Sequence, residues 1–150
     1  MRAQISGKAG SWFRMVRTFL MKIDAIQPTQ LYISSEKLNT VMRSLARTKS
    51  MVIEHIPIKR LDNQVVFVDG HTRVFAAFLH SLSDIPVCWE DEELDWDEYR
   101  LCVGWCKEEG INVISDLRKR VVAHKDYQVL WLDRCKKMQI DLEIKRKTKI

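Results

Sequence analysis

The sequence contains few residues that break regular structure. Proline and glycine occur only 3 and 5 times among 150 residues, which excludes a collagen-like or low-complexity disordered chain. The sequence also lacks any apolar run approaching the roughly 18 residues that a membrane-spanning helix requires. Hydrophobic residues make up 46% of the chain. This length and apolar content fit one compact domain with at most a small appendage.

Charge is distributed in three blocks of opposite sign. Residues 1–60 carry 11 basic and 3 acidic side chains, and residues 61–110 carry 3 basic and 12 acidic side chains. Residues 111–150 return to 11 basic and 5 acidic side chains. The net charge of +5 therefore hides an acidic centre between two basic flanks. Because a polyanion-binding protein gathers positive charge on one surface, any contact with DNA is expected from the flanks.

The chain has four cysteines and no evident secretory signal. Free thiols in a reducing cytoplasm are the default expectation for such a chain. Cys102 and Cys106 share a predicted helix face and could form half of a four-cysteine zinc site with Cys88 and Cys135. The spacing lacks the short knuckle loops of structural zinc sites. We therefore expect a cytoplasmic protein whose cysteines pack as small apolar side chains.

A basic segment precedes the first predicted strand. Between Ser11 and Lys22, aromatic and aliphatic residues alternate with Arg14 and Arg17, and these charges interrupt the apolar stretch that a signal peptide needs. The segment fits a helix that caps the domain, or an upstream extension with translation starting at Met21. A membrane-surface helix and an import sequence are the alternatives. We assign residues 1–25 to a basic amino-terminal extension.

Short strands and helices are predicted to alternate between residues 26 and 94. The strands are expected at residues 31–33, 56–58, 65–68 and 85–89. Because proline is poorly tolerated inside a sheet, Pro57 predicts that its strand lies at an edge. Apolar residues at helical spacing predict one helix after Ser34 or Ser35 and another after Arg73.

Residues 95–150 have a helical pattern instead. Helices are expected from residue 95 or 97 to about 109, from 115 to about 122, and from 125 to about 142. A basic tail follows at residues 145–149. The sequence therefore predicts an α+β half followed by a helical half.

The most informative segment is VVFVDGHTRVFAAFLH, residues 65–80. A buried strand ends at Asp69, a glycine permits a tight turn, and a helix begins at once. The first helical turn then points free N–H groups beyond the strand end, where the helix dipole favours phosphate. Gly70 lets an anion approach the backbone, and Arg73 adds a planar fork of donors. His71 can donate a hydrogen bond or act as an acid or base.

The acidic residue of this motif, Asp69, would repel a bound anion unless it contacts another group. Asp69 beside an anion-binding turn implies a metal ion or a substrate hydroxyl. The structural alternative is an ordinary Asp-Gly turn, in which Asp69 caps the helix and Arg73 pairs with the acidic run at residues 90–95. The residues alone leave both interpretations open.

Several segments, in the right order, resemble the ParB/sulfiredoxin-like superfamily. The matching pieces are residues 26–31, the strand Ile56-Pro57-Ile58-Lys59, the segment from Val65 to Ala77 with its glycine and arginine, and the closing Ile85-Pro86-Val87. The resemblance covers about 65 of the 150 residues. It implies a small mixed sheet with flanking helices at residues 26–94, followed by a helical carboxyl-terminal extension at residues 95–150.

The branches of this superfamily differ at the motif. Sulfiredoxins place a reactive cysteine directly after the glycine, where this chain has His71, so reduction of a sulfinic acid is not expected. Partition ParB proteins typically show G-E-R-R, where this chain has G-H-T-R, and a helix-turn-helix domain follows in them. The free-serine kinases resemble this chain best, because they carry an Asp-Gly-His motif and transfer a nucleotide phosphate to a serine hydroxyl.

This resemblance implies a nucleotide-binding phosphotransferase of the kinase type. The expected ligands are ATP, ADP or CTP with Mg²⁺, and the expected acceptor is a small hydroxyl compound. We expect phosphate binding at Gly70, His71, Thr72 and Arg73, and metal binding at Asp69. The expected catalytic residues are Glu36, Asp69 and His71, with Glu36 chosen because the kinases carry a catalytic acid after their first strand.

Two other functions fit the sequence. The first is a non-catalytic, partition-associated module that binds DNA through its basic carboxyl-terminal half. The second is a structural or toxin–antitoxin-like partner protein that keeps the fold but has a vestigial pocket. The sequence predicts no oligomeric state.

Overall fold

The computed structural model describes residues 17–48 and 53–149. Residues 1–16, with the first part of the predicted capping helix between Ser11 and Lys22, lie outside these residues. The strands are β1 (Phe19–Lys22), β2 (Ile33–Ser34), β3 (Ile56–Leu61), β4 (Gln64–Phe67), β5 (Asp84–Trp89) and β6 (Val121–Val122). The helices are η2 (Ile23–Ala25), α1 (Ser35–Thr48), α2 (His71–Leu79), α3 (Trp96–Glu108), η3 (Ile114–Arg120), α4 (His124–Tyr127), η4 (Gln128–Asp133) and α5 (Arg134–Lys147).

A four-stranded mixed sheet forms one side of the molecule. Its order is β1-β5-β3-β4, in which β3 and β5 run parallel and the two outer strands run antiparallel to their neighbours. A separate pair, β2 and β6, is parallel. Because β1 pairs with β5, the sheet begins before residue 26, inside the segment that the sequence assigns to an amino-terminal extension.

The prediction that Pro57 marks an edge strand is wrong. Strand β3 lies between β5 and β4. The carbonyl of Pro57 accepts a hydrogen bond from the Val68 N–H at 3.0 Å, so the proline nitrogen faces the same side. The paired residues of β3 and β4 begin only with Ile58 and Phe67. The missing N–H of Pro57 therefore falls just beyond the ladder, where a central strand tolerates it.

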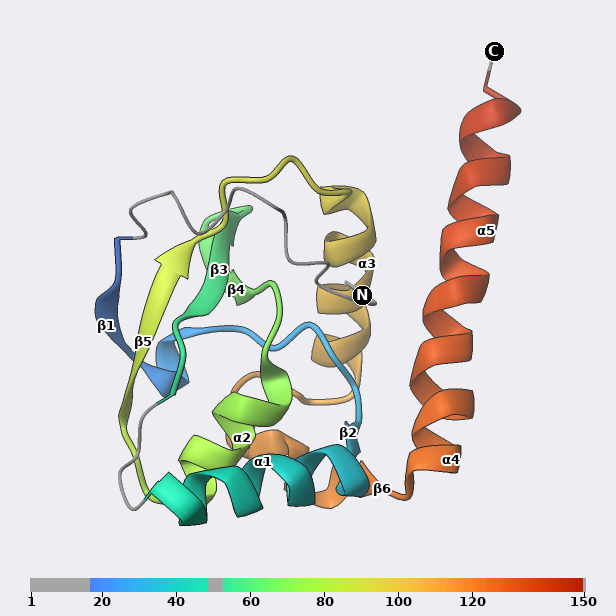
Figure 1. Cartoon of the computed structure of the whole chain (residues 1–150). Coiled ribbons are helices and arrows are strands. Elements are labelled where there is room, and N and C mark those ends of the chain that lie inside the picture. The colour runs from blue at the N-terminus through green and yellow to red at the C-terminus, as the bar shows by residue number, and fades with distance from the viewer. Residues whose placement is uncertain (1–16, 49–52, 150) are drawn as a thin grey trace, which may run out of the picture.

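The helices lie below this sheet and to one side of it (Figure 1). Helices α1 and α2 lie at the base of the molecule, α3 lies beside the sheet, and α5 forms a long column beyond α3. The last three helical elements follow one another without a break, and their middle section, η4, is a π-helix. The core fills the space between these layers, and its largest fully buried side chains are Trp131, Phe67, Phe75, Ile26, Leu31, Ile33, Ile56, Ile58, Ile85, Ile111, Ile114 and Leu117.

The predicted fold class is confirmed. The structure is α+β, with a mixed sheet, flanking helices and a helical carboxyl-terminal part. All four cysteines are free and buried. In the part of the chain that the structure describes, no helix has the length and apolarity to cross a membrane.

Candidate functional site

The segment after β4 forms the predicted strand–turn–helix unit. Gly70 has φ 87° and ψ 17°, the left-handed conformation that glycine adopts at little cost. A Cβ atom at Gly70 would lie 2.9 Å from both the Arg73 Nη2 and the Ile56 Cδ1 atoms. The turn therefore requires glycine for two reasons, its backbone angle and the space above it.

The first turn of α2 keeps its backbone donors free of side-chain caps. No described side chain caps this helix at Gly70. The carboxylate of Asp69, which could have served, instead accepts a hydrogen bond from the Gly70 N–H at 2.8 Å. The initial N–H groups of a helix carry partial positive charge and lack partners within the helix. This end of α2 is therefore a suitable position for an anion.

Arg73 places a fixed positive charge at the same position. Its guanidinium folds back over Gly70, as the distances from the hypothetical Cβ show. The side chain is 30% exposed, and its ion-pair partner is Glu54, with Nη1 and Oε2 3.9 Å apart. The Glu54 side chain is 88% exposed, so solvent and salt screen this long ion pair. An incoming anion can therefore displace it.

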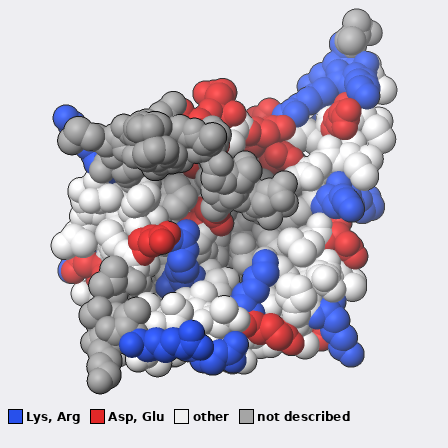
Figure 2. Space-filling model, viewed as in Figure 1, with Lys and Arg blue, Asp and Glu red and all other residues white. Residues whose placement is uncertain are grey.

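A cleft of about 900 Å³ opens from this turn toward the carboxyl-terminal helices. Three cations line it, namely Lys37, Arg73 and Lys136, and three carboxylates line it as well, namely Glu54, Asp69 and Asp133. Figure 2 shows Lys and Arg side chains on both sides of a hollow in this face, with Asp and Glu side chains next to them. The cleft thus presents both cationic and anionic side chains.

His71 begins α2 with its imidazole turned into the protein. The residue is 4% exposed, and its Nε2 accepts a hydrogen bond from the Thr29 N–H at 2.9 Å. Its ring also packs edge-on against Phe67. Burial lowers the pKa of His71 to about 3, so the imidazole is neutral at physiological pH with its proton on Nδ1. The side chain therefore holds the loop at Thr29 against α2.

Glu36 lies at the start of α1 and contacts α4. Its Oε2 accepts a hydrogen bond from the His124 backbone N–H at 2.6 Å and one from the Ser35 hydroxyl at 3.1 Å. Hydrogen bonds from backbone N–H groups and from Ser35 hold the pKa of Glu36 below its usual range. Its neighbour Lys37 lines the cleft, whereas Glu36 is not among the lining residues. The position of Glu36 is that of a cap on α4.

The structure thus gathers most of the predicted site. Asp69, Gly70, His71, Thr72 and Arg73 all line the cleft, and Glu36 is directed toward α4 instead. Thr72 is half-buried at the second position of α2.

The opposite wall of the cleft comes from residues that the sequence interpretation missed. Tyr127, Gln128, Asp133, Lys136 and Gln139 extend along α4, η4 and α5. Burial raises the pKa of Tyr127 to about 12, and the Lys37 ammonium lies 5.1 Å from the centre of its ring. In sequence Tyr127 belongs to the apolar side of a predicted helix and the other four are ordinary polar helix residues, so no local signal indicates that they face the motif.

Carboxylates and cysteines could also indicate a metal centre. Within residues 17–48 and 53–149, no group of three or more His, Cys, Asp or Glu side chains is arranged to hold a metal ion. Mg²⁺ commonly binds through one or two carboxylates together with substrate phosphates. Asp69 therefore fits a magnesium ligand only in combination with a bound phosphate.

Comparisons with known proteins show similarity at the level of structure. No protein-family description and no curated protein sequence matches the chain. Among solved structures, a Pnob8-like ParB-N domain is similar with a TM-score of 0.51 and 13% identity, over 90% of this chain and 50% of that one. Protein Atu1540 from Agrobacterium tumefaciens is similar with a TM-score of 0.44 and 15% identity, over 65% of this chain and 50% of that one. The chain thus spans about half the length of these structures.

Proposed function

We propose that this chain, which has the ParB/sulfiredoxin-like fold, binds the phosphate groups of a nucleotide at the start of α2. The observation that carries the proposal is the position of Arg73 over Gly70, at a helix end without a side-chain cap and at the mouth of a large cleft. The positive end of the α2 dipole, the Arg73 guanidinium and the backbone of Gly70 lie together at this position. Phosphate is the anion that such a combination suits best.

Several groups supply the binding energy in this proposal. Backbone N–H groups of the first turn and the Arg73 fork contact the phosphate oxygens, and the Thr72 hydroxyl is available as a further donor. Lys37 and Lys136 add positive charge from the other sides of the cleft. The cleft volume of about 900 Å³ lies within the range of small-molecule sites. It leaves space for a ribose and base beside Tyr127.

The enzymatic form of this proposal is phosphoryl transfer to a small hydroxyl compound. The acceptor oxygen attacks the terminal phosphorus, the bond from that phosphorus to the bridging oxygen breaks, and the hydroxyl proton passes to a carboxylate of the cleft. Asp69 would hold Mg²⁺ against the phosphates, where the ion neutralises charge on the leaving group. Asp133, in the same cleft, is available as the proton acceptor.

In this scheme the two other predicted catalytic residues, His71 and Glu36, hold neighbouring segments in place and take no part in the proton transfer. The Nε2 of His71 is occupied by the Thr29 N–H, so His71 fixes the loop beside the first turn of α2. Glu36 fixes the start of α4, from which Tyr127 enters the cleft wall.

Calorimetric titration with ATP, ADP and CTP, each with and without Mg²⁺, tests the binding proposal. We expect saturable binding of at least one nucleotide, and a loss of about tenfold or more in affinity for Arg73→Ala, since charge-assisted bonds to phosphate are lost. Arg43→Ala is the matched control, because Arg43 is exposed on α1 and does not line the cleft. Absence of binding, or equal affinity for Arg73→Ala and the unmutated chain, refutes the proposed site.

The transfer reaction has a separate test. Incubation of the chain with a γ-labelled nucleotide, Mg²⁺ and a panel of small hydroxyl compounds should yield a labelled product. Asp133→Asn should abolish the product while it preserves nucleotide binding. If nucleotide binds and no acceptor is labelled, the phosphate site stands and the kinase form of the proposal fails.

A further inference from the structure

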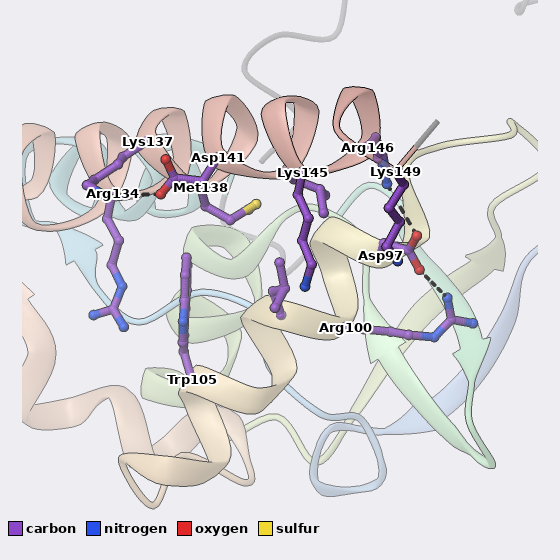
Figure 3. Close-up of a pocket in the computed structure, with 12 residues that line it drawn as sticks. Asp97, Arg100, Trp105, Arg134, Lys137, Met138, Asp141, Lys145, Arg146 and Lys149 are labelled. Carbon is purple, nitrogen blue, oxygen red and sulfur yellow. Dashed lines mark hydrogen bonds and ion pairs between the residues drawn. The ribbon is translucent and has the colours of Figure 1, made fainter.

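A second groove lies between α3 and α5, outside the proposed phosphate site. Its volume is about 770 Å³. Figure 3 shows α5 along one side of the groove and α3 along the other, with Trp105 and Lys145 directed into the space between them. None of its lining residues lines the cleft at the start of α2. The two sites thus occupy different sides of the same carboxyl-terminal helix.

The floor of this groove is apolar. It consists of Leu101 and Trp105 from α3 with Met138 and Leu142 from α5. Leu101 is 41% exposed although a buried core lies directly beneath its helix. The guanidinium of Arg134 lies 4.2 Å from the centre of the Trp105 ring, which fixes that ring as one end of the floor. An apolar floor of this kind stabilises a ligand with an apolar face of its own.

Gly104 adds a feature that the packing of this chain does not explain. Helical spacing places it on the face of α3 that carries Arg100 and Leu101. A Cβ atom at Gly104 would meet nothing within 4 Å, so neither space nor backbone angle requires glycine there. Glycine within a helix is less favourable than alanine. Close approach of another backbone is the use that glycine serves at such a position.

The margin of the groove is basic, and three of its six cations have carboxylate partners. Arg146 bonds both oxygens of Asp95 at 2.7 and 2.9 Å, and Arg100 is paired with Asp62 at 2.9 Å. Lys137 is paired with Asp141 on its own helix.

Three cations of the margin are not paired in this way. Among the described residues, Arg134, Lys145 and Lys149 have no carboxylate partner. They are spaced along α5 from its first residue to a point just beyond its end. The groove therefore offers an apolar floor with an unneutralised positive edge.

We propose that this groove binds an amphipathic α-helix of a partner protein, with an apolar face toward the floor and acidic residues toward α5. A helix fits because the groove follows the 14 residues of α5, about 20 Å at 1.5 Å per residue. The apolar floor of the groove disfavours a nucleic acid backbone, which binds through its phosphates and has no apolar face to place there. Charge complementarity with Arg134, Lys145 and Lys149 selects an acidic partner.

Three fluorescent peptides of about 18 residues test this proposal by anisotropy. The first is an amphipathic helix with a leucine face and glutamate flanks, the second has lysine in place of each glutamate, and the third has the first composition in scrambled order. We expect the first to bind about tenfold or more tightly than the other two, since both the charge and the apolar face contribute. Equal binding of the scrambled peptide overturns the proposal.

Two variants locate the binding surface. Lys145→Glu should weaken binding of the acidic peptide and strengthen binding of the basic one. Lys125→Glu, an exposed control on α4, should change the affinity for neither peptide. Gly104→Gln should weaken binding of the acidic peptide about tenfold. It should not lower the melting temperature of the chain, because glutamine is a better helix former than glycine. Unchanged binding by Lys145→Glu overturns the proposal. So does an oligonucleotide that binds in a Lys145-dependent manner and displaces the acidic peptide.

Discussion

The Nε2 atom of His71 accepts a hydrogen bond from the backbone N–H of Thr29 at 2.9 Å. Both residues are buried, and the Thr29 hydroxyl donates a second bond to the Phe67 carbonyl at 2.8 Å. These contacts join a loop before β2 to the end of β4 and the start of α2. The geometry of the proposed phosphate site therefore depends on a histidine that remains neutral.

Because the buried His71 is neutral, the free energy of unfolding should fall in acid. The pKa of His71 is about 3 in the folded chain, compared with its ordinary value of 6.5. Between these two pH values His71 is therefore protonated in the unfolded chain and neutral in the folded chain. Stability should fall as the pH drops from about 6.5 toward 3, by about 1.4 kcal/mol per pH unit from this group. His71→Gln keeps an acceptor for Thr29 without a titrating group. Urea unfolding between pH 6.5 and 4.5 should give a flatter profile for the variant, and parallel profiles contradict the assignment.

Gly104, which lies within α3, and Gly110, which follows its end, should respond oppositely to alanine. Gly104→Ala should raise the free energy of unfolding by about 0.5–1 kcal/mol, because the site has open space and helical geometry. Gly110→Ala should lower it by about 1 kcal/mol, because Gly110 has φ +73°. Thermal or urea unfolding of both variants gives the comparison. A destabilised Gly104→Ala chain would contradict the open space assigned above.

The sequence predicts most local elements because their signals are local. Apolar spacing indicates α1, α3 and the carboxyl-terminal helices, and the segment from Val65 to Arg73 indicates the turn after β4. Strand β1 was missed because Phe19–Lys22 lies in a segment whose composition suits a helix. It becomes a strand by pairing with residues 84–87, a contact more than sixty positions away that overrides propensity.

The same limit applies to the candidate site. The sequence indicates Gly70 and Arg73 because a strand, a turn and a helix follow one another directly. It does not indicate that Lys136 and Asp133 complete the cleft, because they follow the motif by about sixty residues in the chain. Nor does a histidine after a glycine reveal its burial, which depends on Thr29, 42 positions earlier in the chain.

Removal of the carboxylate that competes for Arg73 should strengthen phosphate binding. Glu54 lies 3.9 Å from the Arg73 guanidinium, and a bound phosphate must displace it. Glu54→Gln should therefore raise nucleotide affinity about two- to threefold at low salt, with the gain lost at high ionic strength. Glu108→Gln, an exposed control outside the cleft, should change nothing. Titration at two salt concentrations checks this, and a weaker Glu54→Gln complex would contradict displacement.

Variants of Glu36 distinguish a positioning role of this residue from a catalytic role. Its ionised carboxylate caps α4 and has a lowered pKa, so this contact stabilises the fold at neutral pH and is lost as the pH falls through the folded pKa. Glu36→Ala should accelerate amide hydrogen exchange at residues 124–127 while α2 keeps its protection. Nucleotide affinity should fall a few-fold in parallel, because α4 carries Tyr127 into the cleft wall. Hydrogen-exchange mass spectrometry checks this. Loss of phosphoryl transfer by Glu36→Gln with unchanged exchange and affinity would instead assign Glu36 to the chemistry.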